Sequence, residues 1–189
     1  MDALETLLTR HSTPSRQLGE PGPDDAQLLR MLEVAVHVPD HGRLTPWRFV
    51  RIQGAARRAL GDALADRLSQ RDHAISQDKL AKERSRFDHA PCIVAVLARL
   101  MPGHKVPESE QLQSGSCACF SLLLAAHALG FGAQWLTGAA AYDAHVLHLL
   151  GVGEHERVLG FIHIGTIHGA QADRPRPDPR TLLTDWHAP

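Results

Sequence analysis

The spacing of hydrophobic residues predicts helices along most of the chain. Leucines recur at helical spacing near the N-terminus, and the acidic pair Asp24–Asp25 is typical of the start of a second helix, which Pro39 ends. The longest segment is apolar nearly all round in its second half and stops at Gly130, so we expect it to be buried. The predicted helices cover residues 2–11, about 24–38, 55–70, about 110–129 and 145–150, and the polar stretch 71–90 is expected to be a mobile helical excursion.

Four segments instead show the pattern of strands. Residues 48–52 alternate like a half-buried strand, whereas residues 91–98 form an almost unbroken apolar run, which is typical of a strand covered on both faces. Residues 130–138 predict a short strand and turn, and residues 157–167 predict the last strong strand. With no internal repeat and no second core, the sequence predicts one α+β domain over residues 1–189, built on a sheet of about four strands.

Composition narrows the class of protein. Twenty basic and 21 acidic side chains among 189 residues give a net charge of -1, which lacks the basic footprint of a nucleic-acid-binding protein. No apolar run reaches the roughly 18 to 20 residues of a membrane span, and the N-terminus lacks the apolar core of a signal peptide. Three cysteines are too few for a disulfide framework. We therefore expect a soluble, cytoplasmic protein with no membrane or nucleic-acid partner.

Several common catalytic and binding motifs are missing. The glycines at 130–132 and 151–153 do not complete a dinucleotide-binding fingerprint, and neither a phosphate-binding loop nor a nucleophile elbow is present. Cys117 and Cys119 lie two residues apart, which favours buried core cysteines over a metal or redox pair. The 13 histidines raise the question of a metal site, since His145 and His148 share a helix face. No third ligand follows at matching spacing, so we expect no bound metal.

The segment Arg10-His11-Ser12 is the first of three that could carry chemistry. A helix C-terminus repels anions, so a phosphate bound there must be held by side chains, and an arginine fork with a hydroxyl suits a phosphate monoester. The alternative is an ordinary solvated helix end.

The other two segments each combine a stiff loop with an aromatic side chain. In residues 39–47, two prolines flank a loop that carries His41 and Arg43 before Trp47, and such a loop could border a planar ligand. In residues 130–138, a helix stops at glycine and a short strand presents Trp135, Leu136 and Thr137, whose backbone amides could bind a heterocycle edge. An ordinary connection and core packing of the tryptophans are the alternatives.

Taken together, the three segments resemble the FMN-dependent nitroreductase family, and specifically its short, single-domain branch. MDALETLLTRHS is similar to that branch's N-terminal helix with its flavin-phosphate motif, and PDHGRLTPWRF is similar to its Pro-Asp-His loop. GFGAQWLTG, LGFIHIGT and HKVP also match, in the right order. The resemblance implies a nitroreductase-like fold with a central mixed or antiparallel sheet flanked by helices, and a homodimer with FMN at the subunit interface. It also implies that the extended C-terminal tail wraps the partner subunit, where composition alone leaves a disordered tail equally open.

The resemblance assigns cofactor contacts by position. It implies that Arg10, His11 and Ser12 hold the phosphate and ribityl end of FMN, that His37 and His41 reach FMN from one of the two subunits, and that Trp135, Leu136 and Thr137 line the ring or ribityl chain. There are departures: Pro14 stands where many relatives have a further arginine, and His37 and Leu136 stand where relatives in this branch carry arginines. If both positions are matched correctly, the site has lost two cationic groups.

The implied activity is that of a flavoprotein oxidoreductase. In this hypothesis NAD(P)H, a transient co-substrate, gives a hydride to N5 of FMN and leaves, after which a nitroaromatic, quinone or activated alkene is reduced in ping-pong order. No side chain acts as a catalytic nucleophile. Two alternatives are an FMN-binding storage or sensing protein without NAD(P)H turnover, and a histidine-rich metal-binding module.

Overall fold

The computed structural model describes residues 2–171 and 173–188 of the chain. The α-helices of this part are α1 (Ala3–Thr9), α2 (Asp25–Ala35), α3 (Ala55–Arg71), α4 (Gln77–Arg84), α5 (Glu108–Ala128) and α6 (Ala144–Leu149). The strands are β1 (Leu18–Gly19), β2 (Trp47–Gln53), β3 (Cys92–Arg99), β4 (Gly132–Leu136) and β5 (Glu156–Ile167). Short 3-10 turns are η1 (Ser15–Gln17), η2 (His41–Arg43), η3 (Ser85–Phe87), η4 (Ala139–Ala141) and η5 (Pro179–Thr181).

The strands form one antiparallel sheet around β5. This strand pairs with β1, β3 and β4, and β3 pairs in turn with β2. The predicted α+β class and its four principal strands are therefore confirmed. The fifth strand, β1, lies outside the four segments predicted as strands, because its two residues are too few to show a period-2 pattern.

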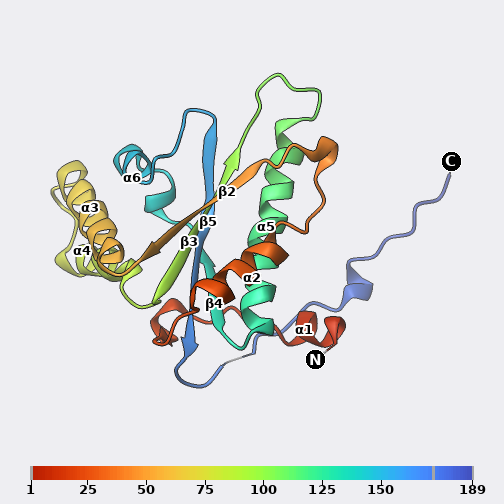
Figure 1. Ribbon diagram of the computed structural model, residues 1–189, viewed down its shortest axis with the longest axis horizontal. Helices are drawn as coiled ribbons and strands as arrows, with labels where there is room; N and C mark the ends of the chain where they lie inside the picture. The colour runs from red at the N-terminus through yellow and green to blue at the C-terminus, as the bar shows by residue number, and fades with distance from the viewer. Residues whose placement is uncertain (1, 172, 189) are drawn as a thin grey trace.

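Helices cover both faces of the sheet. Figure 1 shows α3, α4 and α6 on one side and α2 and α5 on the other. The side chains of β3 alternate between the two cores: Ile93, Ala95 and Leu97 pack toward the first helix group. Cys92 and Val94 pack toward α2 and α5. The unbroken apolar run predicted as a doubly covered strand is thus buried on both faces.

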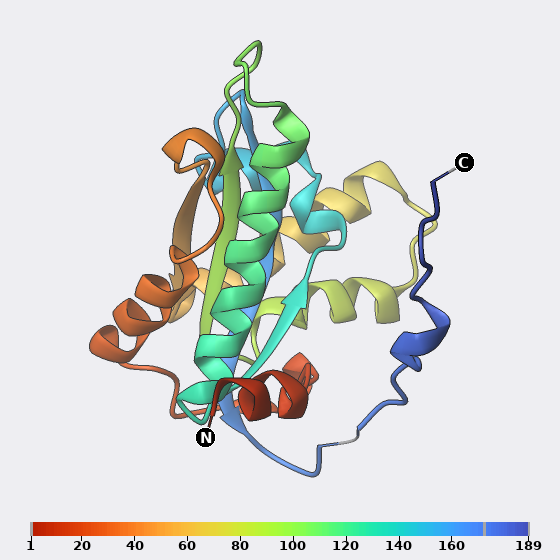
Figure 2. The same cartoon turned by 90° about the vertical axis from the view of Figure 1, so that its right-hand side faces the viewer.

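The long helix α5 is buried on one side only. Leu122 and Ala126 are fully buried, whereas Phe120 is 42% exposed. Figure 2 shows α5 on the outside of the sheet with α1 across its lower end. Cys119 is buried but Cys117 is exposed, so the prediction of a buried Cys117 is wrong. The physical reason is that only one side of α5 meets the sheet, and residues two apart on a helix face different ways.

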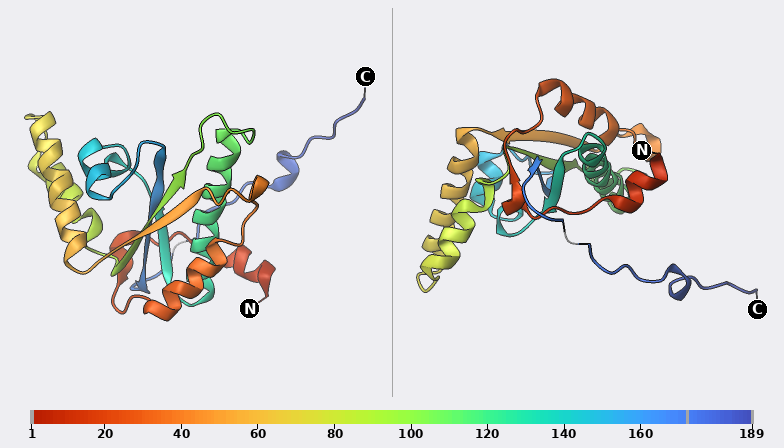
Figure 3. Two further views of the ribbon diagram at one scale, coloured as in Figure 1. Left: turned by 45° about the horizontal axis from the view of Figure 1, so that its top comes forward. Right: turned by 90° about the horizontal axis from the view of Figure 1, so that it is seen from below.

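The C-terminal segment leaves the folded body. Residues 173–188 run away from the sheet (Figure 3), and their largest apolar side chains, Leu182, Leu183 and Trp186, are 70 to 82% exposed. Whether this segment wraps a partner subunit stays a prediction. Within the described residues, no helix combines the length and apolar character needed to cross a membrane.

Candidate functional site

Two of the three segments singled out in the sequence meet at the edge of β4 that does not pair with β5. The backbone amide of Thr13 donates to the carbonyl oxygen of Ala133 (3.0 Å), and the amide of Ser15 donates to Oε1 of Gln134 (2.6 Å). These bonds lay the segment after Ser12 along β4. The fold therefore brings Arg10–Ser12 and Trp135–Thr137 to one side of the molecule, although 123 residues separate Ser12 from Trp135 in the sequence.

Arg10 belongs to a cluster of positive charge. Its Nη1 donates to Oγ of Ser12 (3.3 Å), and its Cζ lies 5.9 Å from the centroid of the Phe120 ring. Burial lowers the pKa of Arg10, and the nearby charges of Arg176 and Arg174 lower it further. The charges of Arg174 and Arg176 thus act on Arg10, and an anion bound beside Arg10 would offset them.

The neighbours of this cluster come from the start of the C-terminal segment. Nε2 of His11 lies 3.3 Å from Oδ1 of Asp173, and the hydroxyl of Thr13 donates to Oε1 of Gln171 (2.8 Å). Sequence reasoning missed Arg174 and Arg176. Their alternation with proline in RPRPDP is the signal that could have identified them, because prolines keep such a segment extended and its arginines outward.

A cavity of about 310 Å³ opens beside the same edge of β4. Its wall is rich in cationic groups, contributed by Arg16, Lys82 and Arg86. Gln134 and Leu136 line it from β4, two residues apart and therefore on the same face of the strand. The remaining lining residues are Pro14, Ser15, Ser85 and His89. Of the predicted Trp-Leu-Thr segment, Leu136 lines the cavity and the side chain of Thr137 is exposed.

Trp135 points to the other face of β4. Its indole Nε1 donates to the carbonyl oxygen of Leu159 (3.0 Å), and the ring packs against the core beneath α2 and α5. An added Cβ at Gly160 would clash with the indole, so a glycine is required on β5 for this approach. The indole has the packing role that the sequence left open as an alternative, and a contact with a cofactor stays a prediction for this residue.

The remaining segment, residues 39–47, lies at the end of α5 that is far from Arg10 (Figure 1). Nδ1 of His41 is 2.7 Å from Oε2 of Glu110, in the first turn of α5, and the side chain of His37 is exposed after α2. Glu110 and Phe120, which adjoin His41 and Arg10 respectively, are ten residues apart on one helix, or about 15 Å along its axis. A single chain therefore does not bring His37 and His41 to Arg10.

The loop that carries His41 holds a sparsely populated backbone conformation. Arg43 and Thr45 have φ values of 54° and 46°. The carboxylate of Asp40 accepts hydrogen bonds from the amides of Leu44 (3.1 Å) and Thr45 (2.8 Å), which keeps the loop in this shape. Backbone strain of this kind is typical of binding and catalytic loops.

The histidines do not assemble a metal centre in the part of the chain that the structure describes. No group of three or more His, Cys, Asp or Glu side chains there has the arrangement of a metal site. His163 is instead fully buried on β5 and stacks on Phe87 at 5.9 Å. Burial, and then the charges of Arg86 and His89, lower its pKa to about 3.

Relatives of known classification align with most of this chain. The model of the nitroreductase family matches residues 7–166. The Escherichia coli (strain K12) protein named "Putative NAD(P)H nitroreductase YdjA" is 36% identical over 186 residues, covering 97% of this chain and 99% of its own. A "Putative NAD(P)H nitroreductase" of Haemophilus influenzae is 35% identical over 167 residues, covering 88% and 89%.

Solved structures agree in fold. A nitroreductase-like family protein from Bacillus cereus superposes with a TM-score of 0.83 at 20% identity, covering 100% of this chain and 97% of its own. A nitroreductase with bound FMN from Bacteroides fragilis gives a TM-score of 0.75 at 22% identity, covering 98% and 99%. With a family model matched over most of its length and relatives about one-third identical across both chains, the chain belongs to the nitroreductase family.

Proposed function

We propose that the chain is an FMN-dependent oxidoreductase, formed by residues 1–189 as one FMN-binding domain and active as a homodimer. The observation that carries the proposal is the cation-lined cavity at the edge of β4, along which backbone and side-chain hydrogen bonds lay the segment that follows Ser12. The relatives named NAD(P)H nitroreductases and the FMN-bound structure from Bacteroides fragilis support this choice of cofactor and co-substrate.

The arginine cluster fits the phosphate of FMN. Guanidinium groups bind phosphate through paired N–H donors, and the hydroxyl of Ser12 adds a further donor beside Arg10. The first helix ends here, so its dipole opposes an anion and side chains must supply the attraction. A dianionic phosphate beside Arg10 would offset the repulsion that Arg174 and Arg176 exert on it. We assign Arg10, His11 and Ser12 to this end of the cofactor, with Arg174 and Arg176.

The cavity fits the flavin end. A volume of about 310 Å³ is within the range of small-molecule sites, which extends from roughly 300 to 1,000 Å³. Leu136 and Pro14 give it apolar surface, and Arg16, Lys82 and Arg86 give it positive charge. Thr137 and the following Gly138, with φ at 74°, end β4 beside the cavity, where backbone groups are free of the sheet ladder. We assign Leu136 and Thr137 to contacts with the ring or ribityl chain.

FMN, when bound, supplies the redox chemistry: it takes hydride equivalents from NAD(P)H and passes them to an electron-poor acceptor such as a nitroaromatic, quinone or activated alkene, in ping-pong order. The side chains of this chain bind and orient the cofactor, and none acts as a nucleophile. The cationic lining of the cavity favours negative charge on a bound ligand, which is the electrostatic contribution that the protein makes.

A second copy of the chain completes the site. His37 and His41 lie far from Arg10 within one chain, so we assign them to the FMN bound mainly by the other subunit. The outer side of α5 exposes Phe120 and Cys117, and α1 exposes Leu4 and Leu8 at 70% and 81%. Exposed apolar side chains of this kind suit an isologous interface between two copies. The C-terminal segment, with its exposed leucines and tryptophan, would pack against the partner.

The experiment is spectroscopic. Purified protein should be yellow with bound FMN, and NADH or NADPH should bleach it under anaerobic conditions. Arg10→Ala should weaken FMN binding by about 1.5–3 kcal/mol, or roughly 10- to 100-fold, because it removes a charge-assisted bond. Arg30→Ala, on the exposed side of α2, is the matched control and should bind FMN as wild type does.

Three results would contradict parts of the proposal. A colourless protein that does not bind added FMN would refute the cofactor. Unchanged affinity in Arg10→Ala would remove this residue from the site. FMN binding without NAD(P)H oxidation, whatever the acceptor, would favour the storage or sensing role.

A further inference from the structure

Arg86 is the most rigidly held cation in the cavity wall. Its Nε donates to Oε2 of Glu83 and its Nη2 donates to Oε1 of the same carboxylate, both at 2.6 Å. The two side chains are only 21% and 11% exposed. A bidentate pair of this kind fixes the plane of the guanidinium group and leaves Nη1 outside the paired edge.

Nη1 of Arg86 lies next to Gly138, two residues after the end of β4. If Gly138 carried a Cβ, its nearest neighbour would be Nη1 of Arg86, at 3.3 Å. Gly138 directly follows the Trp-Leu-Thr segment, and Arg86 lines the cavity together with Gln134 and Leu136. The guanidinium group therefore lies against the part of the chain assigned above to the flavin.

The position of this charge is informative because it lies beside an apolar side chain, Leu136, in the wall of the same cavity. Leu136 and Arg86 line the same cavity from different elements, β4 and η3. Glu83 is absent from the cavity lining, so Arg86 separates this carboxylate from the cavity. The field of Arg86 also extends inward, since it contributes, after burial, to the lowered pKa of His163.

We propose that Arg86, held by Glu83, is the cation that faces the ring of bound FMN and sets its reduction potential. This inference rests on the proposed function. The flavin ring gains negative charge on reduction, so a nearby fixed cation stabilises the reduced form more than the oxidised form. Glu83 has two opposing effects, because its charge attenuates the field of Arg86 while its bonds hold Arg86 in place.

The two charges make predictions of opposite sign. Arg86→Met, which keeps an aliphatic side chain of similar length, should weaken the binding of reduced FMN about tenfold more than that of oxidised FMN. For a two-electron couple this is a potential lower by about 30 mV. Glu83→Gln keeps one hydrogen-bond acceptor for Arg86 and removes the negative charge, so it should raise the potential. Arg86→Lys keeps the charge and should restore most of the loss.

The test uses the purified holoprotein. The potential is measured by equilibrating bound FMN with a reference dye under anaerobic conditions, and the affinity for oxidised FMN is measured by fluorescence quenching. Arg84→Met is the matched control: Arg84 pairs with Asp62 and Asp66 on the surface and does not line the cavity, so its variant should keep the wild-type potential.

The outcomes separate this inference from the proposed function. If wild-type protein binds no FMN, both fail together. If it binds FMN but Arg86→Met and Glu83→Gln shift the potential in the same direction, or neither shifts it, the inference alone is overturned. Should Arg86→Met fail to fold, Glu83→Gln and Arg86→Lys still decide, because a raised potential in the first and a near-wild-type potential in the second are both required.

Discussion

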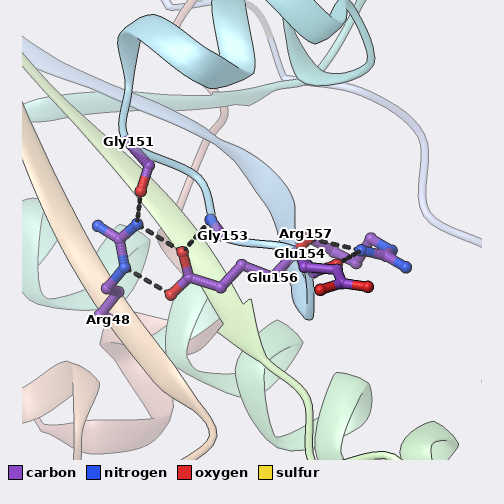
Figure 4. A network of polar contacts seen from close by, with 6 residues as sticks. All are labelled: Arg48, Gly151, Gly153, Glu154, Glu156 and Arg157. Carbon is purple, nitrogen blue, oxygen red and sulfur yellow. Dashed lines mark hydrogen bonds and ion pairs between the residues drawn. The ribbon is translucent and has the colours of Figure 1, made fainter.

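The ion pair between Arg48 and Glu156 offers a quantitative test of how the sheet is held together. Arg48 on β2 donates from Nε and Nη2 to the two carboxylate oxygens of Glu156 at the start of β5, both at 2.6 Å (Figure 4). Nη2 also donates to the carbonyl oxygen of Gly151 (2.7 Å), and the amide of Gly153 donates to Glu156 (2.8 Å). Because β3 lies between β2 and β5, this network joins two strands that share no backbone hydrogen bonds to each other.

The expected magnitude follows from burial and geometry. The side chains of Arg48 and Glu156 are 30% and 14% exposed, so solvent screens the pair only in part. Arg48→Met would leave a half-buried carboxylate with a single backbone donor. Hydrogen bonds to charged groups contribute about 1.5–3 kcal/mol, so we expect a loss of about 2–3 kcal/mol in the free energy of unfolding. For a chain of this length the melting temperature should fall by about 5–10 °C.

The stability that the Arg48–Glu156 ion pair contributes should depend on pH, in a direction that the pKa of Glu156 determines. The hydrogen bonds from Arg48, more than any other cause, hold the pKa of Glu156 below its usual value near 4.5. A depressed carboxyl pKa stabilises the fold above the unfolded-state pKa, and this contribution is lost as the pH falls through the folded-state pKa. The gap in stability between wild type and Arg48→Met should therefore be full at pH 7 and should narrow below about pH 4.5.

The assay is urea unfolding at pH 7 and at pH 3 for wild type, Arg48→Met, Glu156→Gln and the double variant. The cycle should show coupling of more than about 1 kcal/mol at pH 7. Arg30→Met is the control, because its partner Glu33 is a surface residue and such pairs contribute at most about 1 kcal/mol. A gap that stays equal at pH 3 and pH 7, or coupling near zero, would refute the ion pair as the cause.

Two further predictions concern packing beside the candidate site. His163 is fully buried, and neither ring nitrogen has a hydrogen-bond partner among the described residues. Because burial lowers the pKa of this histidine, the unfolded chain takes up a proton below about pH 6.5 that the folded chain does not. The free energy of unfolding should therefore fall as the pH drops from about 6.5 toward 3. His163→Leu should raise the free energy of unfolding at pH 7 by about 1 kcal/mol and flatten that acid limb in urea titrations; unchanged stability and slope would contradict this. Gly61→Ala should destabilise the protein by about 1–2 kcal/mol in thermal melts, because an added Cβ would clash with the carbonyl oxygen of Arg84. Helix propensity alone predicts the opposite, so a rise in melting temperature would argue against this close approach.

The elements that bury large apolar surface were predictable from the sequence. The apolar run of β3, the alternation of β2 and the long pattern of α5 each determine their structure locally, and the structure confirms all three. The start of α2 was equally clear, since Asp24 and Gln27 form a capping box. The strand β1 could not be predicted, because its identity depends on pairing with Ile167 rather than on its own two residues.

The direction in which helices face was less predictable. In α2 the apolar residues Leu29 and Val36 are 60% and 45% exposed, whereas Met31 is fully buried. A leucine-rich surface helix has more than one apolar face, and its orientation depends on where the partner helix α5 lies. Exposed leucines of this kind also mark surfaces that another chain would cover.

For the candidate site, sequence motifs identified the residues at its two ends but not the cationic residues that line the cavity between the flanking elements. Arg10 and Leu136 could be selected because residue type and spacing resemble the family. Arg86, Arg174 and Arg176 come from a polar segment and from the Pro-rich tail, where arginines are usual on a solvated surface. Only the tertiary structure shows that Arg86 lines the cavity and that Arg174 and Arg176 act on Arg10, although the alternation of arginine with proline is a signal that singles out the tail.

The proposed two-subunit site also has a geometric reason in α5. His41 contacts Glu110 near the start of this helix, and Arg10 lies over Phe120 in its second half, where Phe120 is exposed. If two copies pair through the outer side of α5 about a two-fold axis at the level midway between Glu110 and Phe120, the two helices run antiparallel and the start of each meets the second half of the other. One self-complementary surface would then bring His41 of each chain to the arginine cluster of the other and form two equivalent sites at once. The separation of the motifs within one chain, which would be a defect in a monomer, is what an isologous dimer requires.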